Sequence, residues 1–114
     1  MTTNPEDFIV VLTNLPSRDA ALALARALVE QRLAACVNVI DGCTSVYRWK
    51  DAIECEREVP LVIKTRADLF AQLQAAIRTA HPYELPEIIA VRLHDGLREY
   101  LRWVAAQTGM AQVA

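Results

Sequence analysis

The sequence predicts one α+β domain in which strands and helices follow the order βαββαβ, with an additional helix at the C-terminus. Two observations carry this prediction. Apolar residues recur with the strand period and the helix period in alternating segments, and a long hairpin pattern occupies the middle of the chain. The length of 114 residues is close to the usual size of one domain. We therefore expect a single domain over residues 1–114, with residues 1–7 flexible.

The first part of the chain predicts a strand, a helix and a second strand. Phe8–Leu12 is a continuous apolar run, which is typical of a strand buried on both faces. Ser17 is a favourable N-cap, and Arg18–Arg32 carries alanines and leucines at helical spacing. Ala35–Ile40 then predicts the second strand. The two strands should lie parallel in one sheet, because a right-handed crossover helix joins them.

The middle of the chain predicts a long antiparallel hairpin between the second and third strands. Asp41-Gly42 indicates a bulge or bend, after which a strand pattern resumes at Thr44–Trp49. Lys50-Asp51-Ala52 forms a turn, and Glu54–Thr65 alternates as one long strand. Such a hairpin is long for a domain of this size, so it should project beyond the sheet with unpaired backbone groups along its edges.

The last part of the chain completes the order of elements. Ala67–Ala80 has the apolar spacing of a helix, and residues 81–86 form a loop with two prolines. Glu87–Leu93 predicts the fourth strand, and Arg98–Gln107 a short amphipathic helix that ends near Gly109. This βαββαβ order is the split βαβ plan of a ferredoxin-like sandwich.

Composition and charge exclude several classes of function. The net charge is −2 and the lysines and arginines are scattered singly, so no basic stripe is present to bind nucleic acid. No signal peptide is visible, and no apolar run is long enough to cross a bilayer. The three cysteines lack CxxC spacing, which argues against a disulfide framework and a structural zinc site. We expect a reduced, cytoplasmic protein without nucleic-acid or membrane partners.

A series of short motifs is spread over nearly the whole chain, from about Phe8 to Ala106. No single motif is specific. The motifs are Ala35-Cys36-Val37-Asn38-Val39-Ile40, Thr44-Ser45-Val46-Tyr47-Arg48-Trp49-Lys50, Glu58-Val59, Ile63-Lys64-Thr65, His81-Pro82-Tyr83-Glu84 and Tyr100-Leu101 with Trp103. In this order and at these intervals, they resemble the divalent cation tolerance (CutA) family.

The resemblance implies a ferredoxin-like fold, a compact homotrimer similar to that of PII signalling proteins, tolerance of divalent metals and copper binding. It implies no accepted reaction, so we expect that the protein is not an enzyme. Thr13 and Ala80 stand where some relatives carry a cysteine and a histidine of a Cys/His/His copper site. Of those ligands, only His81 carries over.

Three residues are candidate metal ligands: His81, Glu84 and Cys36. His81 and Glu84 lie in one loop, three residues apart, and copper(II) favours imidazole and carboxylate ligands, whereas copper(I) favours thiolates such as Cys36. Simpler interpretations remain open. His81 stabilises the end of the preceding helix in one of them, and Cys36 is a small buried apolar residue in another. Cys43 and Cys55 are neighbours only if the hairpin register pairs them.

A polar cleft between subunits is the second candidate site. Lys64 follows the apolar run Leu61–Ile63 and needs a partner or a water-filled pocket. Glu58 lies on the same strand face, and Tyr47 shares a face with Trp49. The predicted cleft is lined by Trp49, Glu58, Lys64, Tyr83 and Glu84. Packing against a neighbouring subunit is the simpler interpretation of the aromatic residues.

The leading hypothesis is a homotrimeric divalent-cation tolerance or response protein that binds copper or another divalent metal. A PII-like sensor of a small anionic ligand is the alternative, although the chain has only three glycines and no anion-binding loop. An enzyme with Glu58, Lys64 and Tyr83 as an acid–base set is a third hypothesis. The hairpin independently predicts self-assembly, because head-to-tail pairing into a ring would cover its edges. The resemblance supplies three as the number of members.

Overall fold

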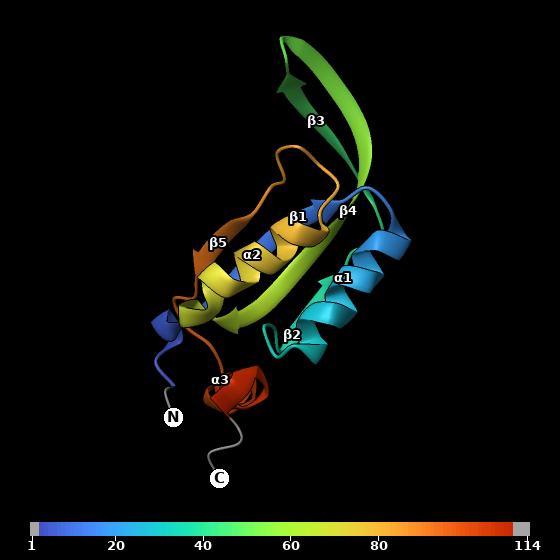
Figure 1. Cartoon of the computed structure of the whole chain (residues 1–114). Helices are drawn as coiled ribbons and strands as arrows, with labels where there is room; N and C mark the ends of the chain where they lie inside the picture. The colour runs from blue at the N-terminus through green and yellow to red at the C-terminus, as the bar shows by residue number, and fades with distance from the viewer. Residues whose placement is uncertain (1–2, 111–114) are drawn as a thin grey trace.

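The computed structural model describes residues 3–110 of the chain as one five-stranded sheet with three α-helices (Figure 1). The strands are β1 (Phe8–Leu15), β2 (Cys36–Val39), β3 (Cys43–Trp49), β4 (Ala52–Arg66) and β5 (Ile89–Arg92). The helices are α1 (Arg18–Glu30), α2 (Phe70–Ala80) and α3 (Arg98–Ala105). Short 3₁₀ helices cover Pro5–Asp7 and Ala67–Leu69, and a π-helical segment, Ala106–Met110, follows α3.

The topology agrees with the order predicted from the sequence. The strands lie in the order β2-β4-β1-β5, and β3 pairs with the outer half of β4. Every neighbouring pair is antiparallel, so β1 and β2 run parallel to each other on the two sides of β4. This is the arrangement of a ferredoxin-like α+β sandwich, and the predicted fold class is confirmed.

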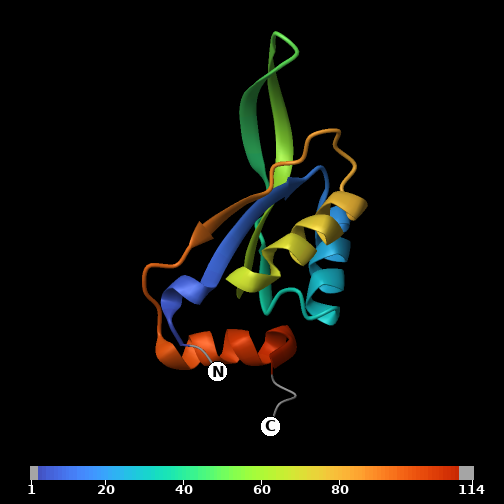
Figure 2. The ribbon, with the colours of Figure 1, turned by 60° about the vertical axis from the view of Figure 1, so that its left-hand side comes forward.

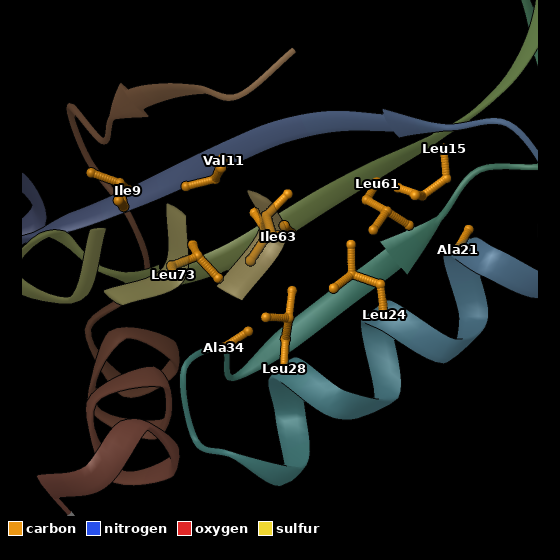
Figure 3. Close-up of a cluster of buried hydrophobic side chains, with 11 residues drawn as sticks. Ile9, Val11, Leu15, Ala21, Leu24, Leu28, Ala34, Leu61, Ile63 and Leu73 are labelled. Carbon is orange, nitrogen blue, oxygen red and sulfur yellow. The ribbon is translucent and has the colours of Figure 1, made fainter. Parts of the chain in front are cut away.

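The main core lies between the sheet and the helices α1 and α2 (Figure 3). The helix α1 begins where the sequence predicts, because the Ser17 side chain accepts a hydrogen bond of 3.1 Å from the Ala20 N–H. The core side chains come from both strands and helices: Ile9, Val11, Leu15, Ala21, Leu24, Leu28, Ala34, Leu61, Ile63, Leu73 and Ile77. Their alternation along β1 and β4 shows that one sheet face is covered by the helices.

The hairpin of β3 and β4 projects from the sheet, which makes the molecule elongated, with extents of 51 × 26 × 24 Å (Figures 1 and 2). The predicted bend is present, with Gly42 at a φ of 85° between β2 and β3. At the tip, Lys50 and Asp51 have φ angles of 48° and 65°. Positive φ at both residues matches the twist of a two-residue hairpin loop.

The opposite end of the sheet is closed by α3 (Figure 2). Phe8 and Ala35 form a second buried cluster with Leu101, Val104 and Ala105 of this helix. The Arg66 guanidinium fixes the segment after α3, donating from Nε to Thr108 Oγ1 at 3.0 Å and from Nη2 to the Thr108 carbonyl at 2.7 Å. The cluster explains why the chain adds a third helix to the βαββαβ plan.

Several element boundaries differ from the sequence prediction, most clearly toward the C-terminus. The last strand, β5, is shorter than Glu87–Leu93, and α3 ends at Ala105, two residues before Gln107, after which the backbone leaves helical geometry at Thr108 and Gly109. Gly109 has a φ of 90°. The expected flexible segment 1–7 contains the Pro5–Asp7 3₁₀ helix, which the Asn4 side chain caps by accepting from the Glu6 N–H. Met1 and Thr2 lie outside the described residues.

The second face of the sheet is not covered by α1 or α2. Val10, Leu12 and Val62 point to this face and are half-buried, and they lie beside Ile89 and Val91 of β5. Ile89 and Val91 are 50% and 54% exposed. We call this set of apolar side chains the bare sheet face. Within residues 3–110, no helix has the length and apolar character needed to cross a membrane.

Candidate functional site

The hairpin and the loop after α2 approach each other on one side of the molecule. Lys50 at the hairpin tip lies 3.7 Å from Glu84 of this loop, measured from Nζ to Oε2. Between the two segments is a hollow with a volume of about 550 Å³. Its lining includes Tyr47, Trp49, Glu56, Arg57, Tyr83 and Glu84. The structure therefore brings together Trp49, Tyr83 and Glu84 of the predicted cleft.

A second hollow, of about 410 Å³, adjoins the first and shares Tyr47, Tyr83 and Leu85 with it. Glu58 and Glu87 contribute its carboxylates. Glu58 is 7% exposed, although it carries a carboxylate. We refer to the two together as the double hollow. It includes four of the five residues predicted for the cleft.

Tyr83 is the hydrogen-bond partner of the buried Glu58 carboxylate. Burial and a hydrogen bond to Glu58 together raise the pKa of Tyr83 to about 12, with the negative charge of Glu58 adding to the effect. Tyr83 therefore remains a hydrogen-bond donor to Glu58 at neutral pH. Burial also raises the pKa of Tyr47, and the nearby Glu56, Glu58 and Glu54 raise it further. The double hollow is thus an environment of negative charge.

Lys64 is not part of this cleft. Its ammonium donates to Asn38 Oδ1 and lies 3.9 Å from the sulfur of Cys36, which is its cross-strand neighbour in β2. The period of two correctly places Lys64 and Glu58 on one face of β4, but six residues of extended chain separate them by roughly 20 Å. The partner that this lysine requires is an amide and a thiol of β2, and not Glu58.

His81 connects the end of α2 to β1 through a hydrogen bond. Its Nε2 lies 2.6 Å from the Asn14 carbonyl oxygen, and its Nδ1 lies 3.2 Å from the Tyr83 backbone N. A neutral ring satisfies both contacts, with Nε2–H donating to the carbonyl and Nδ1 accepting from the N–H. The side chain is 8% exposed. A metal would have to displace one of these hydrogen bonds in order to bind His81.

The other two candidate ligands lie elsewhere. Glu84 forms its exposed ion pair with Lys50. Cys36 lies in β2 beside Lys64, and Tyr100 of α3 is close enough for burial and a hydrogen bond with Cys36 to raise the pKa of the Tyr100 phenol. Cys36 pairs with Lys64, whereas His81 contacts Asn14, which pairs with Pro60 further along β4. Cys36 and His81 are therefore at different ends of the sheet.

Within one subunit, the candidate ligands do not fit a metal site. Residues 3–110 contain no group of three or more His, Cys, Asp or Glu side chains arranged to hold an ion, and tight binding usually requires at least three protein ligands. Cys43 and Cys55 do not supply a thiolate pair either. Cys43 pairs with Glu58 and Cys55 with Val46, so the two cysteines are three positions apart along the hairpin and on opposite faces.

Two features of the site were not anticipated from the sequence. Tyr100 contacts Cys36 across a helix–sheet interface that no local pattern reveals. Thr13 is 1% exposed and its hydroxyl has no hydrogen-bond partner among the described residues. The sequence does contain a signal for this feature. Thr13 is a polar residue at an inward position of β1, between the apolar Val11 and Leu15.

Comparisons with known proteins agree on one family. The family model of the CutA1 divalent ion tolerance protein matches residues 9–107. The divalent-cation tolerance protein CutA of Thermus thermophilus is 45% identical over 100 residues, which cover 88% of this chain and 97% of that protein. Human protein CutA is 42% identical over 104 residues, which cover 91% of this chain and 58% of that longer protein.

Solved structures give the same result. The divalent cation tolerance protein of Thermus thermophilus superposes with a TM-score of 0.87 at 44% identity, covering 90% of this chain and 99% of that one. CutA of Xylella fastidiosa gives a TM-score of 0.87 at 39% identity, with 90% and 98% coverage. Because the family model covers residues 9–107 and relatives of 45% identity share the fold, this chain belongs to the CutA divalent ion tolerance family.

Proposed function

We propose that this chain is the subunit of a homotrimeric divalent-cation tolerance protein, and that copper or another divalent metal binds where a second subunit completes the ligand set. Family membership supports the role in cation tolerance. The bare sheet face supports the assembly, because monomeric proteins rarely expose a continuous apolar patch. Because residues 3–110 of one chain hold no group of three such ligands, the proposal requires a second subunit to supply part of the ligand set.

The assembly would protect surfaces that one subunit leaves uncovered. The edge strand β5 exposes Ile89 and Val91, and the hairpin carries Val46 at 69% and Ile53 at 62% exposure. Backbone groups along the outer edges of β3 and β5 have no neighbouring strand in the described sheet, and such edges favour pairing with another chain. A head-to-tail contact of this kind must close into a ring.

Sedimentation equilibrium at micromolar concentration tests the assembly. We expect a mass of three times the 12.7 kDa of one chain. Val91→Glu places a charge on the bare sheet face and should give a folded monomer. Ala23→Glu is the matched control, because Ala23 is an exposed residue of α1, and it should leave the trimer intact. A monomeric wild-type protein with native circular dichroism would contradict the proposal.

Calorimetric titration of the metal-free trimer with copper(II) tests the metal. If His81 exchanges a hydrogen bond for the ion, His81→Ala should weaken copper binding by about tenfold, or about 1.4 kcal/mol. His94→Ala is the control, because His94 is the other histidine and is exposed in the loop before α3. Equal affinity of the two variants would remove His81 from the ligand set. Absence of copper binding by the wild-type protein would refute the copper assignment.

Cytoplasmic location belongs to the same proposal. Curated relatives include proteins named as chloroplastic, and a solved relative from Archaeoglobus fulgidus is named as periplasmic. Members of the family therefore carry different compartment names, so the proposed location of this chain rests on its three cysteines, which form no disulfide with one another. Fractionation of the native host tests it, and recovery with periplasmic markers would contradict it.

A further inference from the structure

The double hollow carries more carboxylates than cations. Glu56 and Glu84 line its first part, and Glu58 and Glu87 line its second. The basic residue in the two linings is Arg57. Four carboxylates therefore face one guanidinium and the ammonium of Lys50, which lies against Glu84, so negative charge still prevails and an anionic ligand would be repelled. This excess argues against the anion-sensor alternative and favours a cationic ligand.

The same walls contain aromatic rings. Tyr47, Trp49 and Tyr83 line the first part, and each presents a π-system within the same hollow as the carboxylates. The faces of such rings attract organic cations, and tryptophan is the strongest of the three. Aromatic rings do not ligate divalent metals, which prefer converging oxygen, nitrogen or sulfur atoms. The lining thus suits an alkylammonium group better than a metal ion.

The chain already holds one alkylammonium group at this position. Lys50 Nζ lies 5.5 Å from the centroid of the Trp49 ring and 3.7 Å from Glu84 Oε2. The Lys50 and Glu84 side chains are 72% and 73% exposed. Ion pairs this exposed are weak, because water competes for both partners. Lys50 is therefore placed to occupy the cation position and to leave it at little cost.

We propose that the double hollow binds a small organic cation with an alkylammonium group, and that Lys50 is a tethered competitor that leaves Trp49 and Glu84 when the ligand enters. This goes beyond the proposed role in cation tolerance. It depends on the lining of one subunit and not on copper. A basic side chain of a neighbouring subunit has the same chemistry, and the titration below distinguishes it from a free ligand.

The test is a titration of the trimer of this chain with butylammonium, which reproduces the end of a lysine side chain. Butanol is the uncharged control of nearly equal size, and magnesium is the control for charge alone. Trp49 fluorescence reports binding in a Trp103→Phe background, because Trp103 is the other tryptophan and lies on α3. Butylammonium should bind saturably, whereas butanol and magnesium should not compete with it.

Three variants separate the parts of the proposal. Lys50→Met removes the tethered competitor and should strengthen butylammonium binding by about two- to fivefold, as expected for loss of an exposed ion pair. Glu56→Gln removes a lining carboxylate that the Lys50 pair does not use, and should weaken binding. Asp51→Asn, at the neighbouring turn residue outside both linings, should leave the affinity unchanged.

Several results would overturn the inference. They are equal binding of butanol, an unchanged or weaker affinity in Lys50→Met, or no binding of butylammonium by the wild-type trimer. The last result would mean that a neighbouring subunit already fills the hollow. Circular dichroism confirms that each variant is folded, and all the substituted positions are on the hairpin surface apart from the reporter background. None of these experiments uses copper or measures the mass of the assembly. A negative result would therefore refute the binding of an organic cation without refuting the proposed function.

Discussion

The unpaired hydroxyl of Thr13 gives the sharpest stability prediction. Its Oγ1 is buried within the core side of β1 and has no hydrogen-bond partner among the described residues. Valine has nearly the same shape without the hydroxyl, so Thr13→Val removes a buried polar group and keeps the packing. Since an unsatisfied buried hydroxyl costs about 1–3 kcal/mol, we expect the variant to be more stable by about 1 kcal/mol, the low end of this range.

Thr65 provides a matched control for the same substitution. It is 0% exposed on the adjacent strand β4, but its hydroxyl donates a hydrogen bond of 2.7 Å to the Leu33 carbonyl. Thr65→Val leaves that carbonyl without its hydroxyl donor and should destabilise the protein by about 1–2 kcal/mol. The two isosteric changes, both inside the sheet, are thus expected to have opposite signs.

The assay is urea unfolding followed by circular dichroism at one fixed protein concentration, because the stability of the proposed trimer would depend on concentration. The midpoint should rise for Thr13→Val and fall for Thr65→Val, with equal slopes. A loss of stability in Thr13→Val as large as that in Thr65→Val would refute the reasoning. It would show that the Thr13 hydroxyl has a partner and contributes to the fold.

Two further predictions concern the tyrosines and the first helix. Burial raises the pKa of all three tyrosines above 10.0, and that of Tyr83 to about 12. A raised pKa stabilises the neutral phenol in the folded state, so this contribution is present below pH 10 and is lost as the pH rises toward 12. Ultraviolet titration of the native protein should show Tyr83 ionising last, and Tyr83→Phe should remove that step; ionisation of all three near pH 10 would contradict it. Ser17→Ala should lower the stability by about 1 kcal/mol because it removes the cap of α1, and an unchanged urea midpoint would show that the Ser17 hydrogen bond is dispensable.

Local patterns predict the fold of this chain well. The apolar run at Phe8–Leu12, the cap at Ser17 and the turn at Lys50–Asp51 each act within a few residues, so they can be recognised without the partners in space. The hairpin follows from the turn and the alternation on its two sides. The ends of β5 and α3 depend instead on contacts with β1 and Arg66, and the sequence prediction misplaces them.

The candidate site depends on tertiary contacts, and it could be predicted only in part. Strand alternation gives the face of Lys64 but not its distance from Glu58 along the strand, and in one chain Lys64 lies outside the double hollow and contacts β2. The role of His81 depends on the Asn14 carbonyl, 67 residues earlier in the chain. In contrast, Trp49, Tyr83 and Glu84 lie in two short segments that the hairpin length brings together, and their proximity is confirmed.

The most direct test of the proposed function compares copper binding by the trimer with copper binding by the Val91→Glu monomer. Val91 is three strands across the sheet from Cys36 and lies outside the loop that carries His81 and Glu84, so the substitution leaves the candidate ligands of one subunit in place. If the metal site is completed between subunits, calorimetric titration should show copper binding by the wild-type trimer and loss of that binding in the folded monomer. Binding of equal affinity by the monomer would contradict the account, because a single subunit would then hold the metal alone.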